Sequence, residues 1–220
     1  MIRIAIDGPG GAGKSSVAKA VASELQIIYV DTGALYRTIG MYMINSGIDL
    51  KNSQEVINHL GDFTLELKFI DGKQVILLDG VDVGDNIRTP EVSMAASAVS
   101  AIPEVRQYIL DMQRNIAENN SVIMDGRDIG TVVLPNAQVK IFLTADDTER
   151  AMRRYKELQE KGSSVTYQEV LDDLRVRDYN DSHREIAPLK PAEDSVIVNT
   201  TNYTLEESID KIVKTVEEKL

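Results

Sequence analysis

The sequence contains no cysteine and no tryptophan among its 220 residues. The absence of cysteine excludes disulfide frameworks, thiolate zinc sites, iron–sulfur clusters and cysteine nucleophiles, and it fits a reducing compartment. Cationic residues are also few, since 24 Lys and Arg stand against 35 Asp and Glu, a formal net charge of −11. Binding to a long nucleic acid needs a broad basic face. We therefore expect no nucleic acid polymer as a partner.

Long hydrophobic runs are missing as well. No apolar stretch approaches the roughly eighteen residues of a membrane-spanning helix, and the segment Met1–Asp7 lacks the pattern of a cleaved signal peptide. We therefore expect a soluble, cytoplasmic protein that acts as a monomer without membrane contact. Hydrophobic residues make up 43% of the chain and charged residues 27%, and a chain of this length buries a full core without disulfides or a structural metal.

Short β-branched runs and amphipathic segments alternate along most of the chain, which predicts strands alternating with helices. The predicted strands are Ile2–Ile6, Ile27–Val30, Ser121–Met124, Val139–Leu143 and Ser195–Val198. The predicted helices are Lys14–Leu25, Leu35–Ile44, Pro90–Ser100, Pro103–Glu118, and three with a capping-box spacing at Asp146, Thr166 and Thr204. This alternation predicts an α/β fold built on a parallel sheet.

One segment interrupts the alternation. Phe63–Phe69 alternates between polar and apolar residues, and Asp71-Gly72 separates it from the apolar run Val75–Leu78 as a hairpin turn signal. Val81–Val83 adds a third short strand. The pattern predicts a small antiparallel β insertion.

A glycine-rich segment follows the first predicted strand and opens the first helix. Gly8-Pro9-Gly10-Gly11-Ala12-Gly13-Lys14-Ser15 matches G-x-x-x-x-G-K-[ST], the phosphate-binding P-loop. In such a loop the backbone N–H groups converge on a polyphosphate at the positive end of the helix dipole. Lys14 reaches the β- and γ-phosphates and the Ser15 hydroxyl ligates Mg²⁺, while Ser16 completes the predicted ATP-binding set. The alternative is a glycine-rich turn that binds nothing.

A P-loop alone does not say whether the γ-phosphate is hydrolysed or transferred to another molecule. The Asn-Lys-x-Asp element of guanine-specific switches is absent, and 220 residues are few for a motor ATPase. A small P-loop protein with many arginines most often transfers phosphate to a small molecule, because phosphoryl transfer needs positioning and charge neutralisation. Nine of the 24 cationic residues lie between Arg150 and Lys190, beside eight acidic ones. A solvated helix pair with i,i+4 ion pairs gives the same local balance.

Two blocks of polar residues follow predicted strands, at the sheet edge where open α/β folds bind ligands. The first is Asp31-Thr32-Gly33-Ala34-Leu35-Tyr36-Arg37, in which Asp31 as a helix cap is the simpler interpretation. The second is Asp125-Gly126-Arg127-Asp128-Ile129-Gly130, in which Asp125 is placed to hold Mg²⁺ through water. Arg127 and Asp128 are costly to bury unless they meet a ligand or each other.

A third block, Arg175–Arg184, is rich in charge. On a helix Arg177, Asp181 and Arg184 fall on one face. A ladder of surface ion pairs has the same spacing, so this block alone is ambiguous. His183 is expected at the helix surface.

In their order, these blocks resemble the bacterial-type cytidylate (CMP) kinases, a family of nucleoside monophosphate kinases. The resemblance rests on the P-loop, Asp31–Arg37, Ile87-Arg88-Thr89 with Ala95-Ala96-Ser97, Asp125–Gly130 and Arg177–Arg184, and it spans the chain, insertion included. It implies a five-stranded parallel sheet and transfer of the ATP γ-phosphate to CMP or dCMP. It also implies a core of 1–30, 104–149 and 185–220, an acceptor-binding region at 31–103 and a lid with arginine-rich helices at 150–184.

The resemblance also implies the roles of individual residues. The residues it places at CMP are Thr32, Tyr36, Arg37, Ser97, Arg106, Arg127, Asp128, Asp181 and Arg184. Of these, Thr32 (Ser in many relatives), Arg37 and Arg127 address the phosphate, Asp181 and Arg184 face the sugar, and Ser97, Arg106 and Asp128 read cytosine. The residues it places at the transferring group are Lys14, Arg127, Arg153 and Arg177.

The assignment of Asp128 to the base fits cytosine chemistry. A carboxylate accepts a hydrogen bond from the N4 amine of cytosine. Uracil presents a carbonyl at that position, and a buried carboxylate left unpaired costs about 1–3 kcal/mol. Two alternatives stay open, namely another small-molecule kinase with the same P-loop core and a regulator that binds ATP without turning it over.

Overall fold

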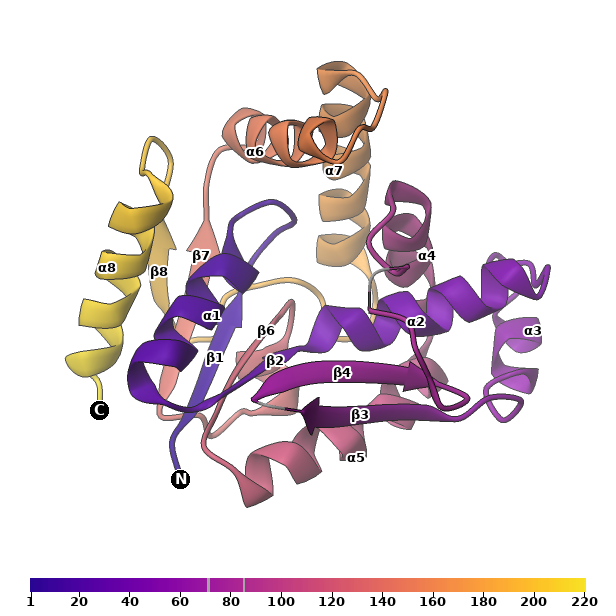
Figure 1. Ribbon diagram of the computed structural model, residues 1–220, viewed down its shortest axis with the longest axis horizontal. Helices are drawn as coiled ribbons and strands as arrows, with labels where there is room; N and C mark the ends of the chain where they lie inside the picture. The colour runs from indigo at the N-terminus through magenta and orange to yellow at the C-terminus, as the bar shows by residue number, and fades with distance from the viewer. Residues whose placement is uncertain (71, 85) are drawn as a thin grey trace.

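The computed structural model describes residues 1–70, 72–84 and 86–220. Its larger sheet has five parallel strands in the order β2-β6-β1-β7-β8 (Figure 1). These strands are β1 (Arg3–Asp7), β2 (Ile28–Asp31), β6 (Val122–Gly126), β7 (Val139–Thr144) and β8 (Val196–Asn199). The predicted α/β class and five-stranded parallel sheet are confirmed.

The helices follow the predicted periodicity closely. They are α1 (Lys14–Leu25), α2 (Thr32–Asn45), α3 (Ser53–Asn58), α4 (Pro90–Ser100), α5 (Pro103–Asn119), α6 (Asp147–Glu160), α7 (Tyr167–His183) and α8 (Leu205–Glu217), with a short π-helix, η1, at Ile129–Val133. Sequence reasoning missed α3 and η1, because each is too short to show a helical period. It placed Arg184 on the helix that carries Arg177, whereas α7 ends one residue earlier.

The two faces of the large sheet are covered by different helices. Ile4 and Ile6 of β1 belong to an apolar cluster with α1 and α8, whereas Ala5 between them belongs to a cluster with α5 and η1. Successive side chains of a strand point to opposite faces, so a strand covered on both faces is apolar throughout. This burial explains the run Ile4–Ile6, which is apolar on both faces of the strand, and the P-loop follows at the carboxyl end of this central strand.

The insertion forms its own antiparallel sheet in the order β3-β4-β5, as predicted. Its strands are β3 (Leu65–Ile70), β4 (Lys73–Leu78) and β5 (Val81–Asp82). Gly72 has a φ of +74°, a left-handed conformation that glycine adopts without strain, while Asp71 of the predicted turn lies outside the described residues. The insertion buries its apolar side chains against α2, α3, α4 and α5.

Helices α6 and α7 share a small apolar cluster of their own (Ala151, Leu158, Val170 and Leu171). Capping boxes are present at Thr166 and Thr204, as predicted. The capping box predicted at Asp146 is wrong, because its side chain makes no capping bond and Glu149 pairs with Arg153 instead (3.4 Å). In the described part of the chain, no helix combines the length and the apolar character needed to cross a membrane.

Candidate active site

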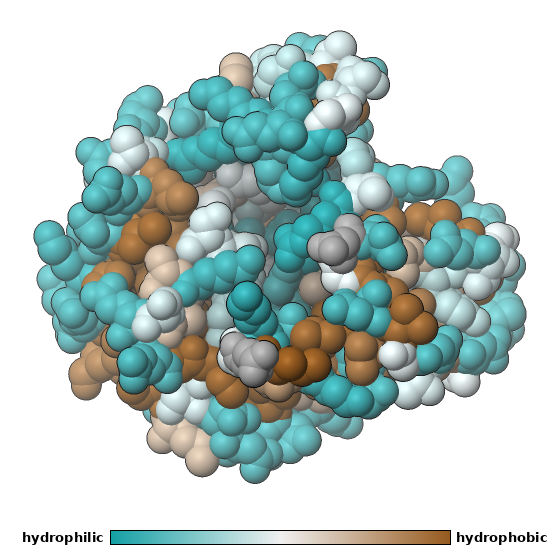
Figure 2. Space-filling model, viewed as in Figure 1, coloured by the Kyte–Doolittle hydropathy of each residue, from teal (hydrophilic) through white to brown (hydrophobic). Residues whose placement is uncertain are grey.

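A cleft of about 680 Å³ opens between the P-loop, the start of α2, α4 and the α6–α7 pair. The face shown in Figure 2 is hollowed near its centre and rimmed mostly by hydrophilic side chains. A second pocket of about 40 Å³ adjoins the cleft and shares four lining residues with it, Gly33, Gly126, Arg127 and Arg177. The two hollows therefore adjoin at these shared residues.

The P-loop forms the floor of the cleft, which every residue from Gly10 to Ser16 lines. A Cβ at Gly8 would collide with the carbonyl oxygen of Leu143, so the close approach of the loop to β7 requires glycine. Lys14 is buried, and its Nζ donates to the carbonyl of Pro9 (2.7 Å). Burial, together with the neighbouring charge of Arg127, lowers the pKa of Lys14 well below its usual value. An anion bound in the loop would raise the pKa of Lys14 again, because its negative charge stabilises the protonated amine.

Ser15 and Asp125 meet beside the loop. Ser15 Oγ donates to Asp125 Oδ2 (2.8 Å), and the Tyr29 hydroxyl donates to Asp125 Oδ1 (2.8 Å). The described residues contain no group of three or more His, Cys, Asp or Glu side chains able to cage a metal. Magnesium usually takes one or two protein oxygens and completes its shell with phosphates and water, so this hydroxyl–carboxylate pair fits it.

Asp31 anchors the start of α2. Its Oδ1 accepts the N–H of Ala34 (3.0 Å), which makes it the N-cap, and its Oδ2 accepts from Arg37 (2.7 Å) and Arg88 (3.2 Å). Although burial alone raises it, the two guanidinium groups hold the pKa of Asp31 below its usual value. The capping interpretation of Asp31 is therefore confirmed, and the same carboxylate also orients two arginines that line the cleft.

The smaller pocket collects most of the residues predicted to bind CMP. The members that line it are Thr32, Tyr36, Ser97, Arg106, Arg127, Asp128, Asp181 and Arg184, while Arg37 lines the larger cleft. The structure therefore brings together residues from α2, α4, α5, the loop that follows β6, and α7 with the residue after it.

Ion pairs in this pocket connect distant segments. Asp128 pairs with Arg106 and lies 3.6 Å from Arg184, while Asp181 accepts from Arg127 Nε (2.9 Å) and from Ser97 Oγ (3.1 Å). The adjacent Arg127 and Asp128 thus each find a different partner rather than each other. Burial takes most of these charges out of water, which costs free energy. The close pairing of acids with arginines offsets that cost.

Three arginine nitrogens at the site are buried without a hydrogen-bond partner. Among the described residues they are Arg37 Nε, Arg177 Nε and Arg184 Nη2, and Thr131 Oγ1 is a fourth buried atom of this kind. Buried donors are normally satisfied in native proteins. Burial and the nearby charge of Arg127 also lower the pKa of Arg177 to about 10. These donors and the crowded positive charge match the oxygens of an anionic ligand.

Comparison with known proteins decides the family, because the family model described as cytidylate kinase matches residues 4–218. The chain belongs to the cytidylate kinase family. Relatives named cytidylate kinase include proteins of Caldicellulosiruptor saccharolyticus (49% identical, covering 97% of this chain and 94% of that protein), Thermosipho melanesiensis (48%, 99% and 97%) and Lactobacillus johnsonii (44%, 100% and 95%).

Among solved structures, the crystal structure of an uncharacterized protein from Eubacterium ventriosum is similar to this chain, with a TM-score of 0.54. The sequences are 15% identical, and the likeness covers 99% of this chain and 98% of that one. It therefore concerns the fold alone.

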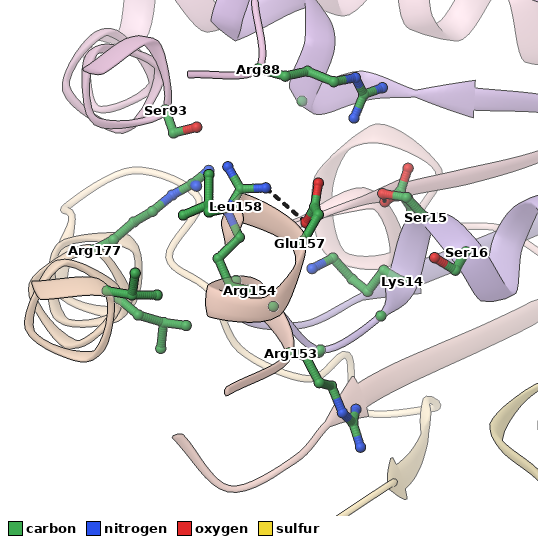
Figure 3. A pocket seen from close by; sticks show the side chains of 18 of the residues that line it. Lys14, Ser15, Ser16, Arg88, Ser93, Arg153, Arg154, Glu157, Leu158 and Arg177 are labelled. Atoms are coloured by element: carbon green, nitrogen blue, oxygen red, sulfur yellow. Dashed lines mark hydrogen bonds and ion pairs between the residues drawn. The ribbon is translucent and has the colours of Figure 1, made fainter. Parts of the chain in front are cut away.

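The segment implied to be the lid of this cytidylate kinase fold presents two neighbouring arginines to the cleft. Figure 3 shows the Arg153 side chain pointing away from Lys14, and its guanidinium donates to the carbonyls of Thr200 (2.8 Å) and Tyr203 (3.3 Å). Arg154, which sequence reasoning did not single out, lies inside the cleft and pairs with Glu157 (2.8 Å). Contact between Arg153 and a transferring phosphoryl group stays a prediction, and it requires the Arg153 side chain to leave these two carbonyls.

Arg150 and Asp178 bind the P-loop backbone at Gly10, and sequence reasoning predicted neither contact. Arg150 Nη1 donates to the carbonyl of Gly10 (2.8 Å) and to Asp178 Oδ2 (2.6 Å), while the N–H of Gly10 donates to Asp178 Oδ1 (3.2 Å). The two side chains come from α6 and α7, 28 residues apart. A motif search could not pair them, because their only sequence signal is the general density of charge in this region.

Asp7 is a buried acid that was also missed. It ends β1, and its two oxygens accept the N–H groups of Ile129 and Gly130 (2.7 Å each), which follow Asp128. Burial raises the pKa of Asp7 from its usual 3.8 to about 7, although both backbone bonds act in the opposite direction. The carboxyl therefore links the strand before the P-loop to the loop that carries Asp128.

This raised pKa predicts a pH dependence of stability. The folded state holds the Asp7 proton more tightly than the unfolded chain, so the stabilisation is fully present below about pH 4 and is lost as the pH rises through about 7. We expect the free energy of unfolding to fall more steeply between pH 4 and 7 in wild type than in Asp7→Asn, by up to about 1.4 kcal/mol per pH unit. Denaturant titrations of both proteins at several pH values test this, and parallel curves would contradict it.

Proposed function

We propose that this protein transfers the γ-phosphate of ATP to CMP or dCMP, giving CDP or dCDP and ADP. Membership of the cytidylate kinase family supports this reaction and makes the enzyme a nucleoside monophosphate kinase, a phosphotransferase. The observation that carries the proposal is the pocket beside the P-loop, where the Asp128 carboxylate lies near arginine nitrogens of Arg177 and Arg184 that have no hydrogen-bond partner. Phosphate and cytosine need these two kinds of group.

On the donor side, we place the ATP phosphates over the segment Gly8–Ser16. Lys14 neutralises charge on the transferring group, and a group that acts where charge develops lowers the barrier most. Ser15 would hold Mg²⁺ directly and Asp125 through water, and the ion supplies charge neutralisation on the phosphate oxygens when bound. Arg177 extends from α7 toward the same space in Figure 3.

On the acceptor side, Arg37 and Arg127 take the CMP phosphate, while Asp128, Arg106 and Ser97 take the base. Asp181 and Arg184 then face the sugar. No general base is needed, because the CMP phosphate is already a nucleophilic oxyanion. Closure of the α6–α7 lid excludes water and so limits hydrolysis of ATP.

The Thr32 hydroxyl does not point its proton at the place of the CMP phosphate. Its hydroxyl donates to the backbone carbonyl of Asp125 (2.7 Å), and a hydroxyl has a single proton to give. In this arrangement Thr32 ties the start of α2 to β6, the strand that carries Asp125. We therefore assign its contribution at the phosphate to positioning of this junction.

We also propose that the enzyme acts as a monomer in the cytoplasm. A single chain supplies both the P-loop and the acceptor pocket, so neither half of the proposed site depends on a second copy. The division into a core, an acceptor-binding region and a lid is supported by the separate apolar clusters of the insertion and of α6–α7.

An assay of ADP release with CMP, dCMP, UMP and AMP tests the proposed function. We expect turnover with CMP and dCMP, and a kcat/KM for UMP lower by at least about tenfold, because the Asp128 carboxylate would face a uracil carbonyl where cytosine offers an amine donor. Transfer to a different acceptor alone would favour another small-molecule kinase. ATP binding without ADP release on any acceptor would favour a regulator.

A further inference from the structure

Gln74, on β4, joins the antiparallel insertion to the edge of the large sheet. The backbone N–H of Asp31 donates to Gln74 Oε1 (2.7 Å), and Gln74 Nε2 donates to the carbonyl of Asp31 (3.1 Å). β2 is an edge strand of the large sheet, and an edge strand presents backbone groups without a ladder partner. An amide side chain offers both a donor and an acceptor. Gln74 therefore takes the place of one residue of a neighbouring strand.

The residue that Gln74 holds is the one that orients the arginines of the acceptor site. Asp31 accepts from Arg37 and Arg88 through the same carboxylate oxygen, and it caps α2, the helix that carries Arg37. Arg88 follows the insertion in the chain, so two parts of the polypeptide around the insertion converge on Asp31. In Figure 1, β4 runs beside the start of α2.

We propose that Gln74 is a positioning residue for the phosphate of the acceptor. It fixes the backbone of Asp31, and through the Asp31 carboxylate it sets the directions of Arg37 and Arg88. The inference rests on the proposed function, since it takes the acceptor phosphate to lie against Arg37. Residues of β3, β4 and β5 do not line the cleft, so the insertion acts on the reaction through this contact rather than by touching substrate.

The test compares two neighbouring substitutions on the same strand. Gln74→Met keeps the length of the side chain but removes both bonds to Asp31, whereas Lys73→Met changes an exposed side chain. For Gln74→Met we expect the KM for CMP to rise about tenfold, the scale of losing a hydrogen-bonding partner of a partly buried backbone group. The KM for ATP and the Tm stay close to those of wild type, and Lys73→Met behaves as wild type throughout.

Two further readouts separate positioning from a merely structural role. Hydrogen exchange at the Asp31 amide speeds up in Gln74→Met but not in Lys73→Met, because that amide loses its acceptor. In an Arg37→Met background, Gln74→Met raises the KM for CMP by less than about threefold, since residues that act through one another are not additive.

An unchanged KM for CMP in Gln74→Met would overturn the inference. Equal rises in the KM for ATP and for CMP with a lowered Tm, or a full tenfold effect in the Arg37→Met background, would overturn it as well. Wild-type enzyme that fails to phosphorylate CMP would instead overturn the proposed function. The exchange rate of the Asp31 amide still decides whether Gln74 fixes that residue in such a case.

Discussion

Lys14→Ala is expected to lower kcat by about 10²- to 10³-fold, the scale seen when one preorganised group at a developing charge is removed. Lys14 is buried at the floor of the cleft between the positive charges of Arg127 and Arg177 and the negative charges of Asp125 and Asp178. Alanine lacks the ammonium group that neutralises negative charge on the phosphate during transfer. Steady-state ADP release with saturating CMP measures the effect.

A matched control shows that this effect comes from the site. Lys51→Ala removes a lysine from an exposed turn and should leave kcat within twofold of wild type, by the small effect of most surface substitutions. The Tm of Lys14→Ala shows whether the variant is folded at the assay temperature. A folded Lys14→Ala protein with near wild-type kcat would overturn the assigned role of the P-loop lysine.

Asp128→Asn is expected to produce the second large effect, on acceptor recognition. The substitution removes the negative charge that pairs with Arg106 and lies 3.6 Å from Arg184, both buried. Breaking a buried ion pair costs about 3–5 kcal/mol, and part of that cost falls on CMP binding. We expect the KM for CMP to rise by about 100-fold, equivalent to about 2.7 kcal/mol, with a smaller change in the KM for ATP.

The same variant should also change specificity. An asparagine amide offers a donor to the carbonyl that uracil presents, which the carboxylate of Asp128 cannot do. The ratio of kcat/KM for CMP to that for UMP therefore falls. Asp111→Asn, which changes an exposed acid on α5, serves as the control. A CMP preference that survives Asp128→Asn intact would show that another group reads the base.

Local patterns predicted the donor side of the site well. The bounds of α1 and α4 agree with the predicted ranges, because strand, glycine loop, helix period and proline-led helix starts are all encoded within a few neighbouring residues. The residues of the P-loop are consecutive in the sequence, so the motif alone showed which residues lie together in the fold. The failed capping box at Asp146 shows the limit of such patterns, since Thr201 takes its backbone N–H instead (2.9 Å).

The acceptor side was harder to derive, because its partners lie far apart in the sequence. Ser97 and Asp181 are 84 residues apart, and Arg127 and Asp181 are 54 apart. The family resemblance supplied these residues, but neither charge nor spacing could say which acid pairs with which arginine. The contacts of Asp7 and Gln74 were invisible for a further reason, since each is made to the backbone of another segment and backbone groups leave no signature in a sequence.

In the proposed reaction, the γ-phosphate passes to CMP rather than to water. A single-turnover reaction with ATP labelled in its γ-phosphate, with and without CMP, tests this most directly, because the label can be followed into nucleotide or into inorganic phosphate. We expect labelled CDP in an amount equal to the ADP formed, with little label released when CMP is omitted. Label that appears only as inorganic phosphate, whether or not CMP is present, would contradict phosphoryl transfer to CMP.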